Sequence, residues 1–161
     1  MDDQPREQAA GLQTPFGEAA SSAAKKAMDE IARNWDGALS GQDVEAIHDL
    51  RVGTRRLRAA LSVYEHAFPP RQFQRVEKAM SALTDALGPA RDTDVLIEHL
   101  TSVVEALGES DEAEKVGLRA YIDHLTQQRA GQQAELDKAM CRIDLARITS
   151  DLATSASDQP A

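Results

Sequence analysis

Four side chains that can hold an anion recur at short intervals in one segment: His48, Arg51, Arg55 and Arg58. On a helix that turns about 100° per residue, they fall within an arc of about 80°, and we call them the basic row. A guanidinium meets phosphate or carboxylate oxygens two at a time, and the helical rise places successive arginines of the row about 4.5 to 6 Å apart. This spacing favours a ligand with several phosphates in sequence over a single phosphate. When protonated, His48 supplies a fourth donor.

The arginines of the basic row have no acidic neighbour on their own helix. None has Asp or Glu three or four positions away, and Arg51 and Arg55 even repel each other at that spacing. Elsewhere the sequence offers arginines such acids, at these positions: Arg119 with Asp123, and Arg147 with Asp144 and Asp151. The row is therefore a candidate binding surface. The alternative is a solvated face, or a row neutralised by acids from another helix.

A second candidate feature lies further along the chain, around Gly88 and Pro89. This pair is typical of one helix ending and another beginning. A helix that begins at Pro89 would present free backbone N–H groups and the positive end of its dipole, with Arg91 in its first turn. We expect Asp92 and Asp94 to stabilise that helix start or to orient Arg91 through a salt bridge.

The elements that must position these residues are helices. Apolar residues repeat at helical spacing, no segment alternates as a strand does, and aromatic residues make up only 4% of the chain. Short connections divide the pattern, with Thr14 and Asp43 as helix caps, which predicts an all-α fold, an antiparallel helix bundle. The expected helices are 14–41, 43–68, 70–87, 89–108 and one from Ser110, and residues 139–152 form either a further short helix or a continuation of the last one. The bundle spans 14–152, and we expect 1–13 and 153–161 to be disordered tails.

Composition narrows the classes of function. The net charge is −9, yet residues 43–91 carry a net +2 and the rest carries −11, so the local basic segment is more informative than the mean. The single cysteine, Cys141, excludes an internal disulfide framework and a cysteine-clustered zinc site. No apolar run approaches about 18 residues, so we expect a soluble, cytoplasmic protein.

Two motifs together resemble a known family. The string His48-x-x-Arg51-Val52-x-x-Arg55-Arg56-Leu57-Arg58-Ala59-Ala60-Leu61, followed by Leu87-Gly88-x-x-Arg91-Asp92-x-Asp94-Val95, closely resembles the CHAD domain, and the resemblance covers about residues 16–152. It implies a helical bundle that binds inorganic polyphosphate and is found at polyphosphate granules. By motif match, the implied polyphosphate-binding residues are His48, Arg51, Arg55, Arg58 and Arg91, together with Arg56, which lies at another angle on its helix.

The resemblance covers only the first half of the family's domain. A full CHAD domain is a tandem of two similar bundles, about twice this length, and no second His-x-x-Arg motif follows residue 100. Our hypothesis is a homodimer that restores the missing half by two-fold symmetry; the alternative is a truncated domain. The alternative function is a helical scaffold that docks an acidic protein or a nucleic-acid partner. Beside polyphosphate, nucleic acid is expected only as a weak competitor.

Catalytic and metal motifs are incomplete. The string Glu112-Ala113-Glu114-Lys115 lacks the spacing and strand context of the Glu-x-Glu-x-Lys motif in the triphosphate-cleaving domains that accompany some CHAD domains. No histidine precedes His48-Asp49, as a His-Asp metal phosphohydrolase requires. The pair Glu45-x-x-His48 occurs once, where a di-iron bundle needs two copies. We therefore predict a protein that is not an enzyme and has no catalytic residue, metal or cofactor.

Overall fold

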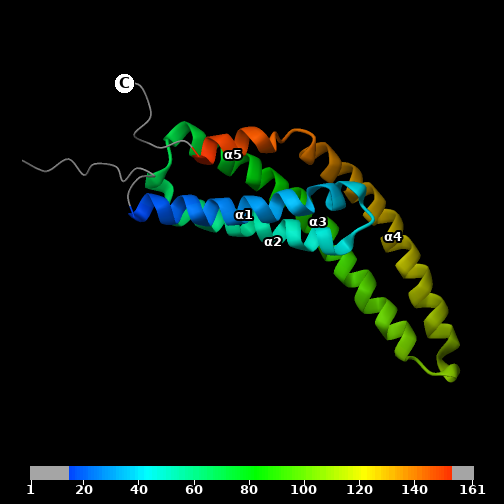
Figure 1. The fold of residues 1–161 in the computed structure, drawn as a ribbon. Helices are drawn as coiled ribbons and strands as arrows, with labels where there is room; N and C mark the ends of the chain where they lie inside the picture. The colour runs from blue at the N-terminus through cyan, green and yellow to red at the C-terminus, as the bar shows by residue number, and fades with distance from the viewer. Residues whose placement is uncertain (1–14, 154–161) are drawn as a thin grey trace, which may run out of the picture. The chain divides into compact units, whose positions relative to one another are not determined.

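The computed structural model describes residues 15–153. The expected cap Thr14 and the expected tails, apart from Ala153 at the end of the last helix, lie outside the described residues. The all-α prediction is confirmed, because the described part of the chain holds five α-helices and no strand (Figure 1). The helices are α1 (Pro15–Ser40), α2 (Val44–Val63), α3 (Pro70–Ala106), α4 (Glu112–Met140) and α5 (Leu145–Ala153). Two short 3-10 turns, η1 (Glu65–Ala67) and η2 (Glu109–Asp111), connect α2 to α3 and α3 to α4.

A tight turn joins α1 to α2. Gly41 adopts a φ of 67°, in the left-handed region that suits glycine, and its N–H donates to the carbonyl of Ala38 at 3.2 Å. Oδ1 of Asp43 then accepts a hydrogen bond from the backbone N–H of Ala46 at 3.0 Å. Asp43 therefore caps α2, as the sequence predicts.

Helix α3 runs through Gly88–Pro89 without a break, so the prediction of two separate helices here is wrong. Proline has no N–H, so α3 loses one backbone hydrogen bond at this point. Buried apolar side chains nevertheless continue on both sides of the proline, with Leu87 before it and Ala90 after it. Packing of this stripe outweighs the unfavourable helix propensity of an interior proline, which is about 3 kcal/mol.

The helices assemble into two compact units. Among the described residues, unit 1 comprises 15–33, 52–81 and 144–153, and unit 2 comprises 34–51 and 82–143, so α1, α2 and α3 contribute to both. The buried apolar core of unit 1 includes Ala27, Met28, Ile31, Leu57, Leu61, Val76, Met80, Ile148 and Leu152. The buried apolar core of unit 2 includes Ala38, Ile47, Leu50, Leu83, Leu87, Leu125, Leu136 and Met140.

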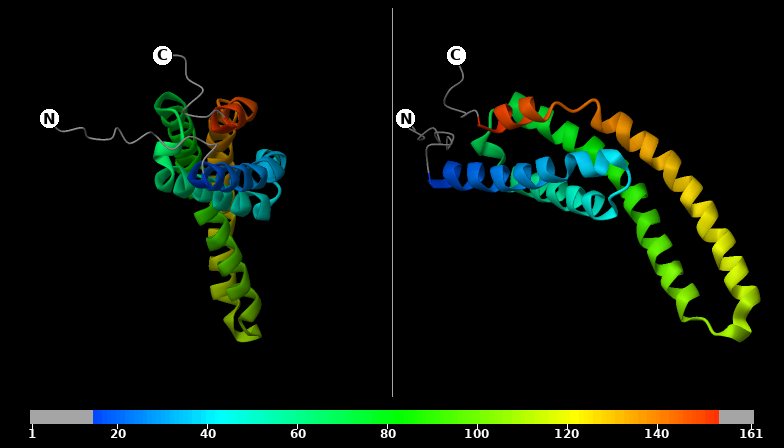
Figure 2. Two further views of the ribbon diagram at one scale, coloured as in Figure 1. Left: turned by 60° about the vertical axis from the view of Figure 1, so that its left-hand side comes forward. Right: turned by 45° about the vertical axis from the view of Figure 1, so that its right-hand side comes forward.

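Within unit 2, the end of α3 and the beginning of α4 run side by side and are joined through η2 (Figure 2). We call residues 95–124 the hairpin arm, and none of these residues is buried. Large apolar side chains stay exposed along it, including Val95 (46%), Val116 (59%) and Tyr121 (48%). Two helices side by side bury only the stripe between them, so the arm leaves apolar surface uncovered.

Candidate functional site

One uninterrupted helix, α2, carries the whole basic row. Its apolar stripe is fully buried at Leu50, Leu57 and Leu61, which fixes the rotation of the helix and leaves the row beside the core. His48 and Arg51 are half-buried and belong to unit 2. Arg55 is exposed and Arg58 is half-buried, and both belong to unit 1.

Two arginines of the row have no counter-charge in the part of the chain that the structure describes. Neither Arg51 nor Arg55 forms a hydrogen bond or an ion pair with any other residue between positions 15 and 153. They lie four residues apart on α2, so their like charges repel each other. Both guanidinium groups therefore retain their donors for an external anion.

Arg58, the last member of the row, binds an acid from another helix. Its Nε and Nη2 donate to Oε1 of Glu77 on α3, at 3.1 Å and 2.9 Å. About a third of each side chain is exposed, at 37% for Arg58 and 34% for Glu77. Solvent weakens an ion pair with this exposure, so an incoming anion can exchange for the carboxylate.

Arg56 points to another side of α2 and also binds an acid. Its Nη1 donates to both carboxylate oxygens of Glu30 on α1, at 2.9 Å and 2.7 Å. An acid from another helix therefore neutralises Arg56 and Arg58, which is the alternative that the sequence left open. Among the described residues, no acid does so for Arg51 or Arg55.

Arg91 lies in the middle of α3, not in the first turn of a helix. The expected free N–H groups and dipole end at Pro89 are therefore absent from this continuous helix, which corrects that part of the prediction. In the described chain Arg91 has no salt bridge to Asp92 or Asp94, and its Nη1 is buried without an acceptor. Arg91 thus keeps an unmatched donor in unit 2 for a reason other than the predicted one.

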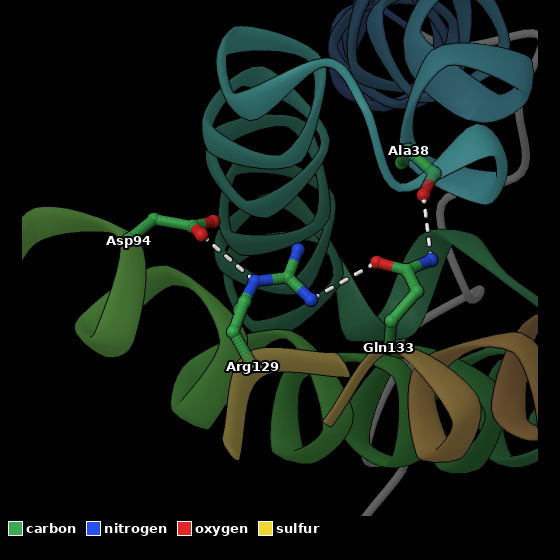
Figure 3. Close-up of polar contacts among 4 residues, drawn as sticks. All are labelled: Ala38, Asp94, Arg129 and Gln133. Atoms are coloured by element: carbon green, nitrogen blue, oxygen red, sulfur yellow. Dashed lines mark hydrogen bonds and ion pairs between the residues drawn. The ribbon is translucent and has the colours of Figure 1, made fainter. Parts of the chain in front are cut away.

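Asp94 is instead the partner of Arg129, a residue that neither of the two sequence motifs contains. Nε of Arg129 on α4 donates to Oδ1 of Asp94 at 2.8 Å, and both side chains are buried (Figure 3). Nη1 of Arg129 donates to Oε1 of Gln133 at 3.1 Å, and Nε2 of Gln133 donates to the carbonyl of Ala38 at 3.0 Å. This chain of contacts, which we call the Arg129 network, ties α3, α4 and the end of α1 together inside unit 2.

A signal for the Arg129 network does exist in the sequence. Leu118, Ile122 and Leu125 set a helical apolar stripe, and the next position on that stripe is occupied by Arg129. A charged residue at a core position requires a buried partner. Its partner, Asp94, is 35 residues away, and helical periodicity alone does not identify it.

Two other arginines do not pair with the acids that helical spacing indicates. Arg119 forms an ion pair with Glu112 at 3.5 Å instead of with Asp123, and Asp151 forms an ion pair with Arg75 at 3.3 Å instead of with Arg147. Oδ1 of Asp144 accepts a hydrogen bond from the backbone N–H of Arg147 at 3.0 Å, so this acid caps α5. Arg75 and Arg119, which lie outside the row, thus pair with acids other than those that helical spacing indicates.

The described residues contain no group of three or more His, Cys, Asp or Glu side chains that could hold a metal ion. None of their helices is both long enough and apolar enough to span a bilayer.

Comparison with protein families decides the classification. The family model of the CHAD domain matches residues 22–161, which is most of the chain. The chain belongs to the CHAD domain family. CHAD domains are associated in general with polyphosphate binding, and they are generally binding domains without catalytic activity.

Two curated relatives are similar to part of the chain. The uncharacterized protein Rv2226 of Mycobacterium tuberculosis strain H37Rv is 33% identical over 73 residues, which are 45% of this chain and 14% of that protein. The uncharacterized protein MT2285 of strain CDC 1551 is 32% identical over 73 residues, with the same coverage. The matched segment spans about a seventh of these relatives' length. No solved structure matches this CHAD chain significantly.

Proposed function

We propose that this CHAD chain binds inorganic polyphosphate, or a related phosphate-rich anion, through the basic row and without catalysing a reaction. The observation that carries the proposal is the pair Arg51 and Arg55, which lie one turn apart with no counter-charge among the described residues. Family membership supports the ligand class, because CHAD domains are associated with polyphosphate in general. The residues proposed to bind are His48, Arg51, Arg55, Arg56, Arg58 and Arg91.

The contacts of these residues predict an order of importance. A hydrogen bond to a charged group contributes about 1.5–3 kcal/mol, so two unpaired guanidiniums on one helix provide useful affinity. Arg51 and Arg55 contribute most because no acid must be displaced from them. Arg58 contributes less because an anion must compete with Glu77. Arg91 also contributes less, because its unmatched Nη1 is buried and the side chain must shift before a phosphate can reach that donor.

A homodimer is the proposed form of the complete binding protein. The hairpin arm supports this, because it has no buried residue and exposes Val95, Val116 and Tyr121. Covering these side chains with a second copy would remove apolar surface from water. Sedimentation over a range of concentrations tests this proposal. A monomer that still binds long polyphosphate tightly would overturn it.

In the cell, such binding would recruit the protein to polyphosphate granules in the cytoplasm. A fluorescent fusion that co-localises with granules, and loses that localisation when Arg51 and Arg55 are both replaced by Ala, is the expected result. Diffuse signal from the unaltered fusion in granule-bearing cells would contradict granule targeting and leave direct binding to be judged in vitro.

Titration with polyphosphate of graded length, with single-stranded DNA as competitor, tests the binding directly. Arg51→Ala and Arg55→Ala should each weaken binding about tenfold while the helical circular dichroism stays unchanged. The matched control is Arg71→Ala, which removes an exposed arginine of α3 that has no partner among the described residues. Equal effects of all three variants would show attraction by overall charge only and would overturn the site.

The scaffold alternative predicts a different outcome of the same titration. A chain that docks an acidic protein would show no affinity gain with polyphosphate length. A chain built for nucleic acid would bind single-stranded DNA at least as tightly as polyphosphate of equal charge. Either result would replace the polyphosphate proposal.

A further inference from the structure

A hollow of about 540 Å³ lies in unit 1, between α1 and α2. The two helices run side by side here (Figure 1), and their close approach has a cause in the sequence. A Cβ on Gly53 would lie 3.1 Å from Cγ1 of Ile31, so the glycine allows α2 to lie close against α1. Small side chains, Ala23, Ala27 and Ala60, line the hollow and leave its volume open.

Positive side chains surround this alanine-lined hollow. Lys26 and Arg33 come from α1, and Arg56 comes from α2. Lys26 and Arg33 are seven residues apart, so they lie on the same side of α1 about 10 Å apart along its axis. Arg56 is directed into the same space by its two hydrogen bonds to Glu30, another lining residue.

The charges of the hollow do not balance. Both acids that line the hollow already form ion pairs, Glu30 with Arg56 and Asp29 with Lys25. Lys25 itself lines a different hollow. Lys26 and Arg33 have no hydrogen bond or ion pair within residues 15–153. Two positive charges therefore remain unmatched around one concave surface, which attracts anions.

We propose that this hollow is a second phosphate-binding place, in which Lys26, Arg33 and Arg56 hold the phosphates of a polyphosphate chain. The inference rests on the proposed function, because it takes the same class of ligand. It adds residues from α1 that the two sequence motifs do not contain. It also gives Arg56 a role separate from the basic row, since Arg56 lies about 100° around α2 from Arg55.

Glu30 regulates the hollow in this proposal. Its carboxylate holds Arg56 in place and competes with any phosphate for the same guanidinium. A single phosphate group competes poorly, whereas a long chain that also contacts Lys26 and Arg33 presents several phosphates to the hollow at once. The hollow should therefore favour long chains over short ones.

Binding of long-chain inorganic polyphosphate by single and paired variants tests the proposal. Lys26→Ala combined with Arg33→Ala should weaken binding about tenfold. The slope of log affinity against log salt should fall by about 1.5, by analogy with the loss of two phosphate contacts on a nucleic acid. The matched control is Arg71→Ala, which removes an exposed arginine of α3 that does not line the hollow.

A third variant tests the competition by Glu30. Glu30→Gln should tighten binding of long chains about threefold, because Arg56 is then no longer held by a carboxylate. If Lys26→Ala and Arg33→Ala each behave like Arg71→Ala, or if Glu30→Gln weakens binding, the hollow is not a phosphate site. That failure differs from failure of the proposed function, in which the unaltered chain does not bind polyphosphate or is insensitive to Arg51→Ala and Arg55→Ala.

Discussion

Arg129 and Asp94 form a buried ion pair in which Nε lies 2.8 Å from Oδ1, with side chains only 10% and 6% exposed. Breaking one side of such a pair leaves an uncompensated buried charge, which costs about 3–5 kcal/mol. We expect Arg129→Ala to lower the free energy of unfolding by an amount in that range, measured by chemical denaturation. The control is Glu112→Gln, which removes an exposed ion pair with Arg119 and should change stability by less than about 1 kcal/mol. Similar losses from both variants would contradict a special role for the buried pair.

Glu77 restrains Arg58, the one arginine of the basic row that holds a carboxylate. Glu77→Gln removes the charge that competes with phosphate, so polyphosphate affinity should rise about threefold. The stability change should stay below about 1 kcal/mol, because both side chains are about a third exposed. Isothermal titration with the two proteins side by side measures the difference. A loss of affinity would show that Glu77 positions Arg58 for the ligand instead of competing for it.

Pro89 sits inside a continuous helix, where its ring and missing N–H are unfavourable. Pro89→Ala should therefore raise the free energy of unfolding, by about 1–3 kcal/mol. Pro70→Ala is the control, because Pro70 begins α3 and a proline is well suited to the first position of a helix. Thermal and chemical denaturation would report both. Destabilisation by Pro89→Ala would indicate that the proline shapes α3 in a way that packing requires.

His48 provides the basic row with an imidazole N–H donor near the beginning of α2. His48→Ala should weaken polyphosphate binding, but by less than Arg51→Ala does, because an imidazole offers fewer donors than a guanidinium. The control is His66→Ala, at an exposed position in η1, which should leave the affinity unchanged. Titration of each variant with polyphosphate measures the difference, with the fold checked by circular dichroism. Equal affinities of His48→Ala and the unaltered chain would remove His48 from the site.

Local sequence signals predict much of the fold. Leu50, Leu57 and Leu61 repeat at helical spacing and are fully buried, so the rotation of α2 follows from the sequence. Asp43 caps that helix as expected. At Gly88–Pro89 the same signals mislead, because tertiary packing of Leu87 and Ala90 holds α3 together across a proline.

The candidate site is predictable only where it depends on one helix. The absence of intrahelical acids around Arg51 and Arg55 can be read from neighbouring positions, and the structure leaves both without a partner among its described residues. The acids of Arg56 and Arg58 lie 26 and 19 residues away in the sequence, and only the packing of adjacent helices brings them close. The hollow lined by Lys26 and Arg33 also depends on how closely two helices approach, so no sequence motif marks it.

The uninterrupted course of α2 from Val44 to Val63 would give the proposed phosphate ligand a direction. One end of the basic row carries an imidazole, and the other carries a guanidinium that is shared with a carboxylate. A phosphate chain with one esterified end therefore meets two unlike termini, and its two orientations differ in energy. A ligand whose two ends differ would be held in one preferred orientation, whereas linear polyphosphate, whose two ends are identical, would not.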